Sequence, residues 1–163
     1  MVNRLVSVLI PSRGRPAELR RTIQAVLDSA LDRQRVEITV RVDGDDGASL
    51  AAARGARPDG SVFIVVGPRG RGKPDTHLYY NRLAEVTAAP WILVWEDDAG
   101  APPRAWDELL ASASRSLLLL HLGPGMRHPA VRREVFTRLR GLSPDPEVGA
   151  WLDQAVRAMG RPS

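Results

Sequence analysis

Residues 6–30 read VSVLIPSRGRPAELRRTIQAVLDSA, and residues 36–46 read VEITVRVDGDD. The apolar run 5–10 predicts a strand, and Pro16 opens a stretch whose apolar residues recur with the helical period. Residues 36–42 alternate apolar and polar side chains, which predicts a second strand with one wetter face. Strand, helix and strand in this order are typical of an α/β fold with parallel strands.

The rest of the chain continues this alternation. We expect further strands at 61–66, 91–95 and 117–122, and helices at 48–54, from Asp75 or Thr76 to Val86, and at 102–110, 129–139 and 146–159. This order predicts a single α/β domain whose central sheet is mostly parallel and flanked by helices. The continuous apolar character of most strands fits burial on both faces.

Composition excludes several classes of protein. The chain has 163 residues, of which 44% are apolar and 26% charged, so disorder is not its main state. No apolar run approaches the roughly 18 residues of a membrane span, and the start does not read as a signal peptide. The absence of cysteine excludes disulfides and cysteine-ligated metals, and we expect a cytoplasmic protein. A net charge of +4, without blocks of like charge, suits an anionic ligand such as a nucleotide and predicts no nucleic-acid partner.

Polar side chains follow the carboxyl end of nearly every expected strand. In chain order they are Ser12, Arg13 and Arg15; Asp43, Asp45 and Asp46; Arg69, Arg71 and Lys73; Glu96, Asp97 and Asp98; and His121. Parallel strands bring these ends to one edge of the sheet, which is where open α/β sheets bind ligands. Carboxylates can hold a hard cation and arginines can neutralise phosphate, so the mixture predicts a site for a metal and a diphosphate.

Two segments at this edge have more than one interpretation. The triplet Glu96-Asp97-Asp98 favours a bound cation, because adjacent carboxylates repel one another, but a solvated turn or a helix cap is the alternative. Residues 67–74, GPRGRGKP, fit G-x-x-x-x-G-K. Pro74 stands where the phosphate loop of an NTPase needs Ser or Thr, which argues against an NTPase. We interpret the segment as a mobile loop that folds over a diphosphate; a flexible basic turn is the alternative.

These segments, together with GKPDTHLYYNRLAEVTAAPWILVWEDDAG (residues 72–100), resemble family 2 glycosyltransferases of the GT-A fold. The matching positions are the Pro and hydroxyl residue after the first strand, an Arg-Pro step, an Asp after the second strand, a helical Asn, and the acidic triplet. The resemblance implies a nucleoside-diphosphate sugar as donor and Mn²⁺ or Mg²⁺ as cofactor. It implies a donor site that includes Pro11, Ser12, Arg15, Asp43, Asn81, Glu96 and Asp97. Arg13, Arg71 and Lys73 join this predicted site because they follow strand ends at the same edge.

The resemblance also implies roles for single residues. Asp43 holds the base, Asp97 contacts the ribose, and Asp98 binds the metal. Asp97, which is adjacent, and His121, which we single out because it lies at a strand end, are the further candidate metal ligands. Glu96 departs from the family pattern, in which Asp is usual. Asp153 is the best match to the catalytic base, although no acid precedes it. Its helical position faces solvent or a cleft, so an ordinary exposed aspartate is the alternative.

We therefore expect a metal-dependent glycosyltransferase, inverting the anomeric centre, with a nucleotide-binding half at 1–100 and a shortened acceptor half at 101–163. A non-catalytic GT-A module that binds nucleotide or glycan, or serves a structural role, is one alternative. A nucleotidyltransferase is another. The acceptor (glycan, lipid-linked or protein), the oligomeric state and an origin in a bacterium or its phage stay open.

Overall fold

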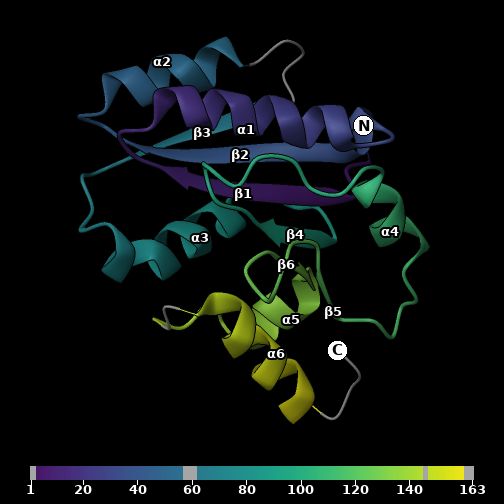
Figure 1. The fold of residues 1–163 in the computed structure, drawn as a ribbon. Coiled ribbons are helices and arrows are strands. Elements are labelled where there is room, and N and C mark those ends of the chain that lie inside the picture. Colours follow the sequence, from purple (N-terminus) through teal and green to yellow (C-terminus); the bar gives the residue numbers. More distant parts are fainter. Residues whose placement is uncertain (1–2, 57–61, 145–146, 160–163) are drawn as a thin grey trace.

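The computed structural model describes residues 3–56, 62–144 and 147–159. A six-stranded sheet with the order β3-β2-β1-β4-β6-β5 forms its centre (Figure 1). The strands are β1 (Val6–Ser12), β2 (Val36–Asp43), β3 (Val62–Gly67), β4 (Trp91–Val94), β5 (Leu119–His121) and β6 (Pro129–Arg132). The helices are α1 (Pro16–Ser29), α2 (Gly47–Gly55), α3 (Thr76–Glu85), α4 (Trp106–Ser112), α5 (Arg133–Arg138) and α6 (Val148–Ala158), with short 3-10 turns η1 (Arg33–Arg35) and η2 (Lys73–Asp75).

The direction of the strands confirms a mostly parallel sheet. Strands β3, β2, β1 and β4 pair in parallel, whereas β6 runs antiparallel to both β4 and β5. Strand β5 therefore runs in the same direction as β4, although β6 lies between them in the sheet. As a result, β1, β2, β3, β4 and β5 all end at the same edge of the sheet.

The prediction of one helix over 129–139 was wrong in its first part. Residues 129–132 form strand β6, and only 133–138 are helical. Ala130 and Val131 are fully buried and pair with β4 on one side and β5 on the other. Pairing and burial on both sides override the local helical pattern here. The helix expected at 102–110 begins later, at Trp106. Residues 61 and 146, the expected starts of β3 and the last helix, lie outside the described residues.

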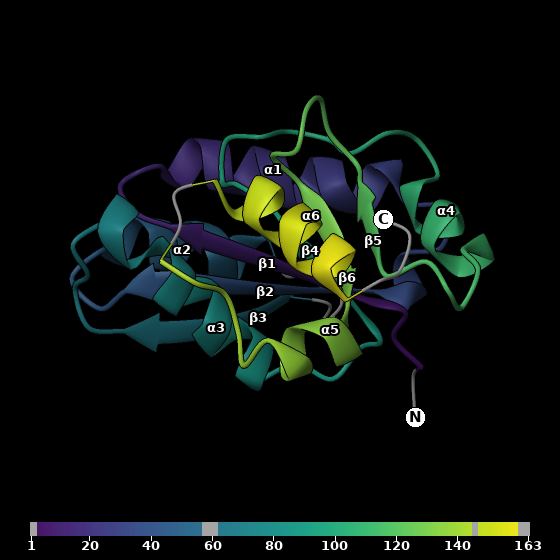
Figure 2. The same cartoon turned by 90° about the horizontal axis from the view of Figure 1, so that it is seen from below.

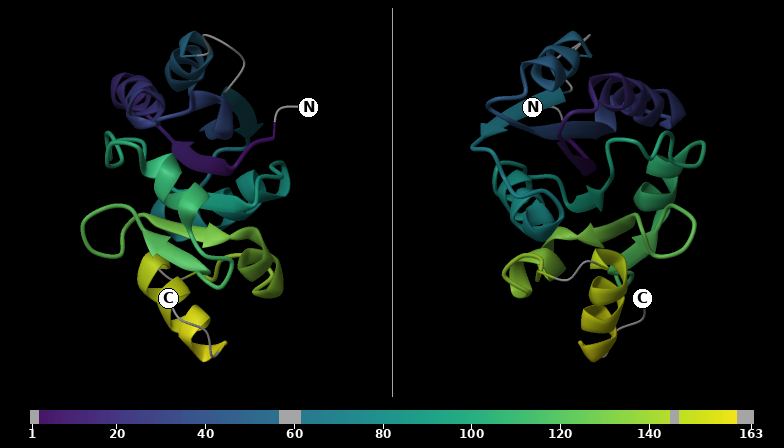
Figure 3. Two further views of the ribbon diagram at one scale, coloured as in Figure 1. Left: turned by 90° about the vertical axis from the view of Figure 1, so that its right-hand side faces the viewer. Right: turned by 60° about the vertical axis from the view of Figure 1, so that its left-hand side comes forward.

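The sheet separates two hydrophobic cores, because alternate residues of each strand point to opposite faces. Val6, Val8 and Ile10 of β1 pack with α1, α2 and α4, whereas Leu9 packs with α3, α5 and α6. Figure 2 looks onto the second of these faces, and Figure 3 shows α2 and α6 at opposite ends of the molecule. Across the described segments, none of the helices is long and apolar enough to cross a bilayer.

Candidate functional site

The acidic triplet after β4 meets the end of β1. Ser12, the last residue of β1, donates a hydrogen bond from Oγ to Oδ2 of Asp97 over 2.7 Å. Burial raises the pKa of the Asp97 carboxyl, against the hydrogen bond from Ser12 and the charge of Arg15. The parallel pairing of β1 with β4 explains the meeting, because it aligns the ends of two strands that are far apart in sequence.

Arg15 links the same triplet to the start of α1. Its Nη1 lies 2.5 Å from Oδ2 of Asp98 and 3.4 Å from Oδ1 of Asp97. The loop between β1 and α1 bends at Gly14, where φ is +67°, and the Gly14 N–H donates to Asp46 over 2.7 Å. Because Pro16 begins α1 directly after Arg15, the guanidinium is held close to the edge of the sheet.

Asp43, at the end of β2, is paired with two arginines. The residue is only 1% exposed, and it accepts hydrogen bonds from Arg13 and, over 2.5 Å, from Nη1 of Arg41. Burial by itself would raise the pKa of Asp43, but the two arginines outweigh it and lower the pKa. Arg41 is itself buried: its guanidinium lies 4.0 Å from the centre of the Tyr79 ring and donates to the Pro68 carbonyl over 2.5 Å. Asp43 is thus held as an ionised carboxylate.

The loop expected to fold over a diphosphate is tied to α3. Arg71 donates to Asp75 from its backbone N–H over 2.8 Å and from its guanidinium over 2.6 and 2.9 Å. These bonds lower the pKa of Asp75. Gly70 leaves no room for a side chain, since an added Cβ would lie 1.7 Å from the Tyr79 hydroxyl. Arg71 is therefore paired with Asp75 of η2, just before α3, although the side chains of both Arg71 and Lys73 are exposed.

The Asn81 side chain hydrogen-bonds the backbone of Leu142. Its Oδ1 accepts the Leu142 N–H over 2.6 Å, and its Nδ2 donates to the Leu142 carbonyl over 3.1 Å. These contacts hold the turn that follows α5. The structure therefore gives Asn81 a packing role and does not bring its amide to the strand-end acids.

Asp153 and His121 lie near each other, on α6 and β5. Asp153 is largely buried rather than an exposed helical aspartate, and it accepts a hydrogen bond from Nε of Arg157 over 2.6 Å. Burial lowers the pKa of His121, and the charge of Asp153 acts in the opposite direction. In the described part of the chain, neither ring nitrogen of His121 has a hydrogen-bond partner, and no three histidine or acidic side chains form a metal-holding group.

A cavity of about 560 Å³ borders the acidic triplet. Glu96, Asp98, Arg127 and His128 are among the residues that line it. Arg127 donates to Glu96 over 3.1 Å, and the ring of His128 lies 4.1 Å from that of Trp95. Sequence analysis missed Arg127 and His128; their place in a Gly- and Pro-rich loop directly after β5 is the signal that could have found them.

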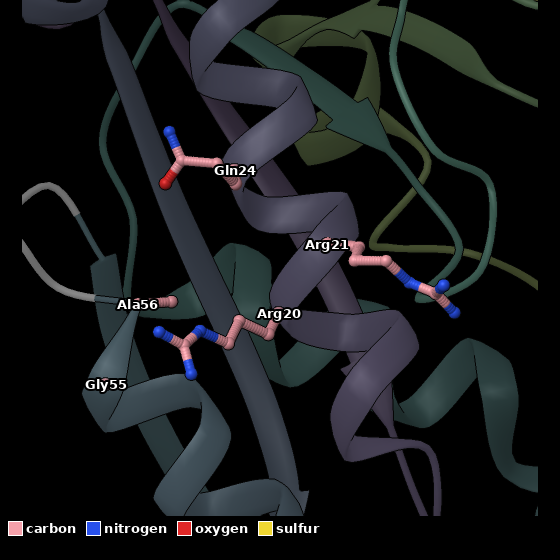
Figure 4. A pocket seen from close by; sticks show the side chains of 5 residues that line it. All are labelled: Arg20, Arg21, Gln24, Gly55 and Ala56. Carbon is pink, nitrogen blue, oxygen red and sulfur yellow. The ribbon is translucent and has the colours of Figure 1, made fainter.

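A smaller cleft of about 340 Å³ lies between α1 and α2 (Figure 4). Arg20 points toward Gly55 and Ala56, at the end of α2, while Arg21 points away from them. Its lining contains none of the strand-end acids, so it is separate from the candidate site.

Comparison with known proteins finds solved structures of similar fold. A mannosyltransferase from Pyrobaculum calidifontis, solved with GDP-Man and Mn²⁺, superposes with a TM-score of 0.81 at 16% identity, over 96% of this chain and 52% of that one. Glucosyl-3-phosphoglycerate synthase from Mycobacterium tuberculosis, solved with Mn²⁺, UDP and phosphoglyceric acid, gives 0.71 at 16% identity, over 96% and 66%. A nucleotidyl transferase from Methanothermobacter thermautotroptrophicus gives 0.64 at 17% identity, over 96% and 84%.

These likenesses establish the GT-A fold, and the chain spans about half the length of the mannosyltransferase. A search of curated proteins found no match. The family model described as glycosyl transferase family 2 matches residues 7–136, which include β1, the acidic triplet and β6. The chain belongs to glycosyl transferase family 2.

Proposed function

We propose that this protein is a metal-dependent glycosyltransferase that moves a sugar from a nucleoside-diphosphate sugar to an acceptor hydroxyl. The observation that carries the proposal is the gathering of Asp43, Asp97, Asp98, Arg13 and Arg15 at one edge of the sheet. Acids that can hold a base, a ribose and a cation lie there beside cations that can hold phosphate. Membership of the family supports the same chemistry.

Each residue has a role that its contacts allow. Asp43, ionised and fixed, accepts an N–H of the base, and Asp97 accepts a ribose hydroxyl. Arg13 and Arg15 neutralise the diphosphate, because a guanidinium donates two parallel hydrogen bonds to phosphate oxygens. Pro11 and Ser12 fix the end of β1 on which these side chains stand.

The donor set also fits a divalent cation. The Asp98 side chain is 48% exposed and borders the cavity, so one carboxylate is accessible. Because the described residues hold no three-ligand group, a cation at Asp98 would take its remaining ligands from diphosphate oxygens and water. Mn²⁺ or Mg²⁺ held by Asp98 would supply Lewis-acid stabilisation of the departing nucleoside diphosphate.

Asp153 is the proposed general base. Its ion pair with Arg157 favours the ionised carboxylate, the form that can accept a proton from an acceptor hydroxyl. A single displacement with this base inverts the anomeric centre. Asp153→Asn should abolish transfer and keep nucleotide binding; transfer near the wild-type rate would remove Asp153 from the mechanism.

Thermal unfolding tests the donor site. We would add UDP, GDP or ADP, each with and without Mn²⁺; a ligand at 100 times its Kd adds about 2.7 kcal/mol of stability. We expect one nucleotide to raise Tm only with the metal, and Asp98→Ala to abolish the shift. Asp28→Ala is the matched control, because Asp28 is also half-exposed (50%) and paired with one arginine, Arg33. A shift that survives in Asp98→Ala would contradict the assignment.

A nucleotidyltransferase is the second candidate. It is favoured by the similarity to the nucleotidyl transferase, of which this chain covers 84%. Both reactions need a metal and a polyphosphate at the same edge, but they cleave different bonds. Release of pyrophosphate from a nucleoside triphosphate and a sugar phosphate would support the second candidate; release of nucleoside diphosphate from a nucleotide sugar would support the first.

A further inference from the structure

Arginines already neutralise the acids at the carboxyl edge of the sheet. The ion pairs are Arg13 and Arg41 with Asp43, Arg13 and Arg69 with Asp45, Arg15 with Asp97 and Asp98, and Arg127 with Glu96. A nucleotide and a cation that enter this edge must therefore exchange partners with these arginines, in addition to making new contacts.

Arg15 is the arginine that touches the proposed metal ligand. Its Nη1 is 2.5 Å from Oδ2 of Asp98, so guanidinium and cation compete for one carboxylate. The Arg15 side chain is 52% exposed and can change partners at low cost, whereas Arg41 is buried and holds three partners. Arg15 also contacts Asp97, the proposed ligand of the ribose. Its guanidinium therefore lies between the proposed sites for the ribose and for the metal.

We propose that Arg15 couples the binding of nucleotide to the binding of metal. Without nucleotide, Arg15 holds Asp98 and weakens its affinity for the cation. When a diphosphate arrives, the guanidinium transfers to the phosphate oxygens, with which it can form a bidentate pair, and Asp98 becomes free for the cation. This inference rests on the proposed function and adds to it the residue that sets the order of binding.

The coupling has a measurable form. It is the factor by which a saturating nucleotide lowers the Kd of the metal, and linkage requires the metal to lower the Kd of the nucleotide by the same factor. Removal of Arg15 frees Asp98 in advance, so metal binding without nucleotide should tighten. The nucleotide then improves the affinity for the metal by a smaller factor, so the coupling factor should fall.

Titration calorimetry tests this with Mn²⁺ alone, with UDP or GDP alone, and with Mn²⁺ at saturating UDP or GDP. Since an exposed ion pair contributes about 0.2–1 kcal/mol, Arg15→Gln should lower the Kd of Mn²⁺ alone roughly 1.4-fold to fivefold and reduce the coupling factor equally. Arg15→Lys should keep most of the coupling, because it retains the charge. Arg21→Gln is the matched control: Arg21 lies on α1, is 76% exposed, and pairs with Glu18.

The outcomes separate the two proposals. If the wild type binds nucleotide and metal, but Arg15→Gln leaves the Kd of Mn²⁺ alone unchanged or higher, the inference is wrong and the proposed function stands. An equal effect of Arg21→Gln would also overturn it, since a general loss of positive charge would then explain the change. If the wild type binds neither UDP, GDP nor Mn²⁺, the proposed function fails and the inference fails with it.

Discussion

Replacement of Arg41 by methionine is the sharpest test of how this site is built. Met retains an unbranched apolar stem but removes the charge, the 2.5 Å bonds to Asp43 and the Pro68 carbonyl, and the contact with the Tyr79 ring. Loss of one partner from a buried ion pair costs about 3–5 kcal/mol, because the other charge is left unsatisfied. Arg13 still pairs with Asp43, so we expect the lower end, about 3 kcal/mol.

The destabilisation caused by Arg41→Met should depend on pH in a definite direction. The pKa of Asp43 is lowered in the folded protein, since its two arginines outweigh burial. A lowered carboxyl pKa adds stability above the unfolded pKa, and that stability is lost as the pH falls through the folded pKa. The cost of Arg41→Met should therefore be largest near pH 7 and shrink as the pH falls below about 4, the ordinary pKa of an aspartate, and through the lowered pKa of Asp43, because protonated Asp43 no longer needs a cation.

Urea unfolding of a double-mutant cycle measures the effect. In the Asp43→Asn background, Arg41→Met leaves no buried carboxylate without its partner, so it should cost about 2 kcal/mol less than in the wild type. A cost below about 0.5 kcal/mol at pH 7, or the same cost in both backgrounds and at both ends of the pH range, would refute the account of Arg41 as the residue that holds Asp43 in place.

Substitutions at three further residues test contacts outside the strand edge. Asn81→Ala should lower the free energy of unfolding by about 1–3 kcal/mol and leave nucleotide binding unchanged, because its amide holds the Leu142 backbone; weaker binding at unchanged stability would return Asn81 to the donor site. Asp107→Ala should lower the free energy of unfolding by about 3 kcal/mol and Asp107→Asn by about half as much. The reason is that the fully buried carboxylate accepts hydrogen bonds, over 2.7 and 2.9 Å, from two backbone N–H groups that follow α1. Equal losses of stability for the two variants in urea unfolding would contradict this. Gly149→Ala should cost about 2 kcal/mol, because its Cβ would lie 1.4 Å from the Met126 carbonyl oxygen; an unchanged unfolding midpoint would mean that α6 does not pack there.

Local patterns were enough to predict most of the fold. The period of apolar residues marks α1 and β2 within a residue or two, because each buries one face along its length. The polar residues at strand ends then predicted the edge at which Asp43, Asp97 and Asp98 collect. Parallel strands joined by helices leave little freedom in where those ends meet.

The partners of individual side chains depended on tertiary structure. Strand β6 has only four residues, and its pairing with β4 and β5 overrides the helical pattern around it. Arg41 belongs by sequence to the wetter face of β2, yet α3 covers it and Asp43 pairs with it. Asn81 matches a family motif by sequence, but its side-chain amide hydrogen-bonds a turn that lies 61 residues away in the chain. Apart from β6, the sequence alone determines most helices and strands, since these depend mainly on near neighbours, whereas contacts between distant residues exist only once the sheet and its helices have packed.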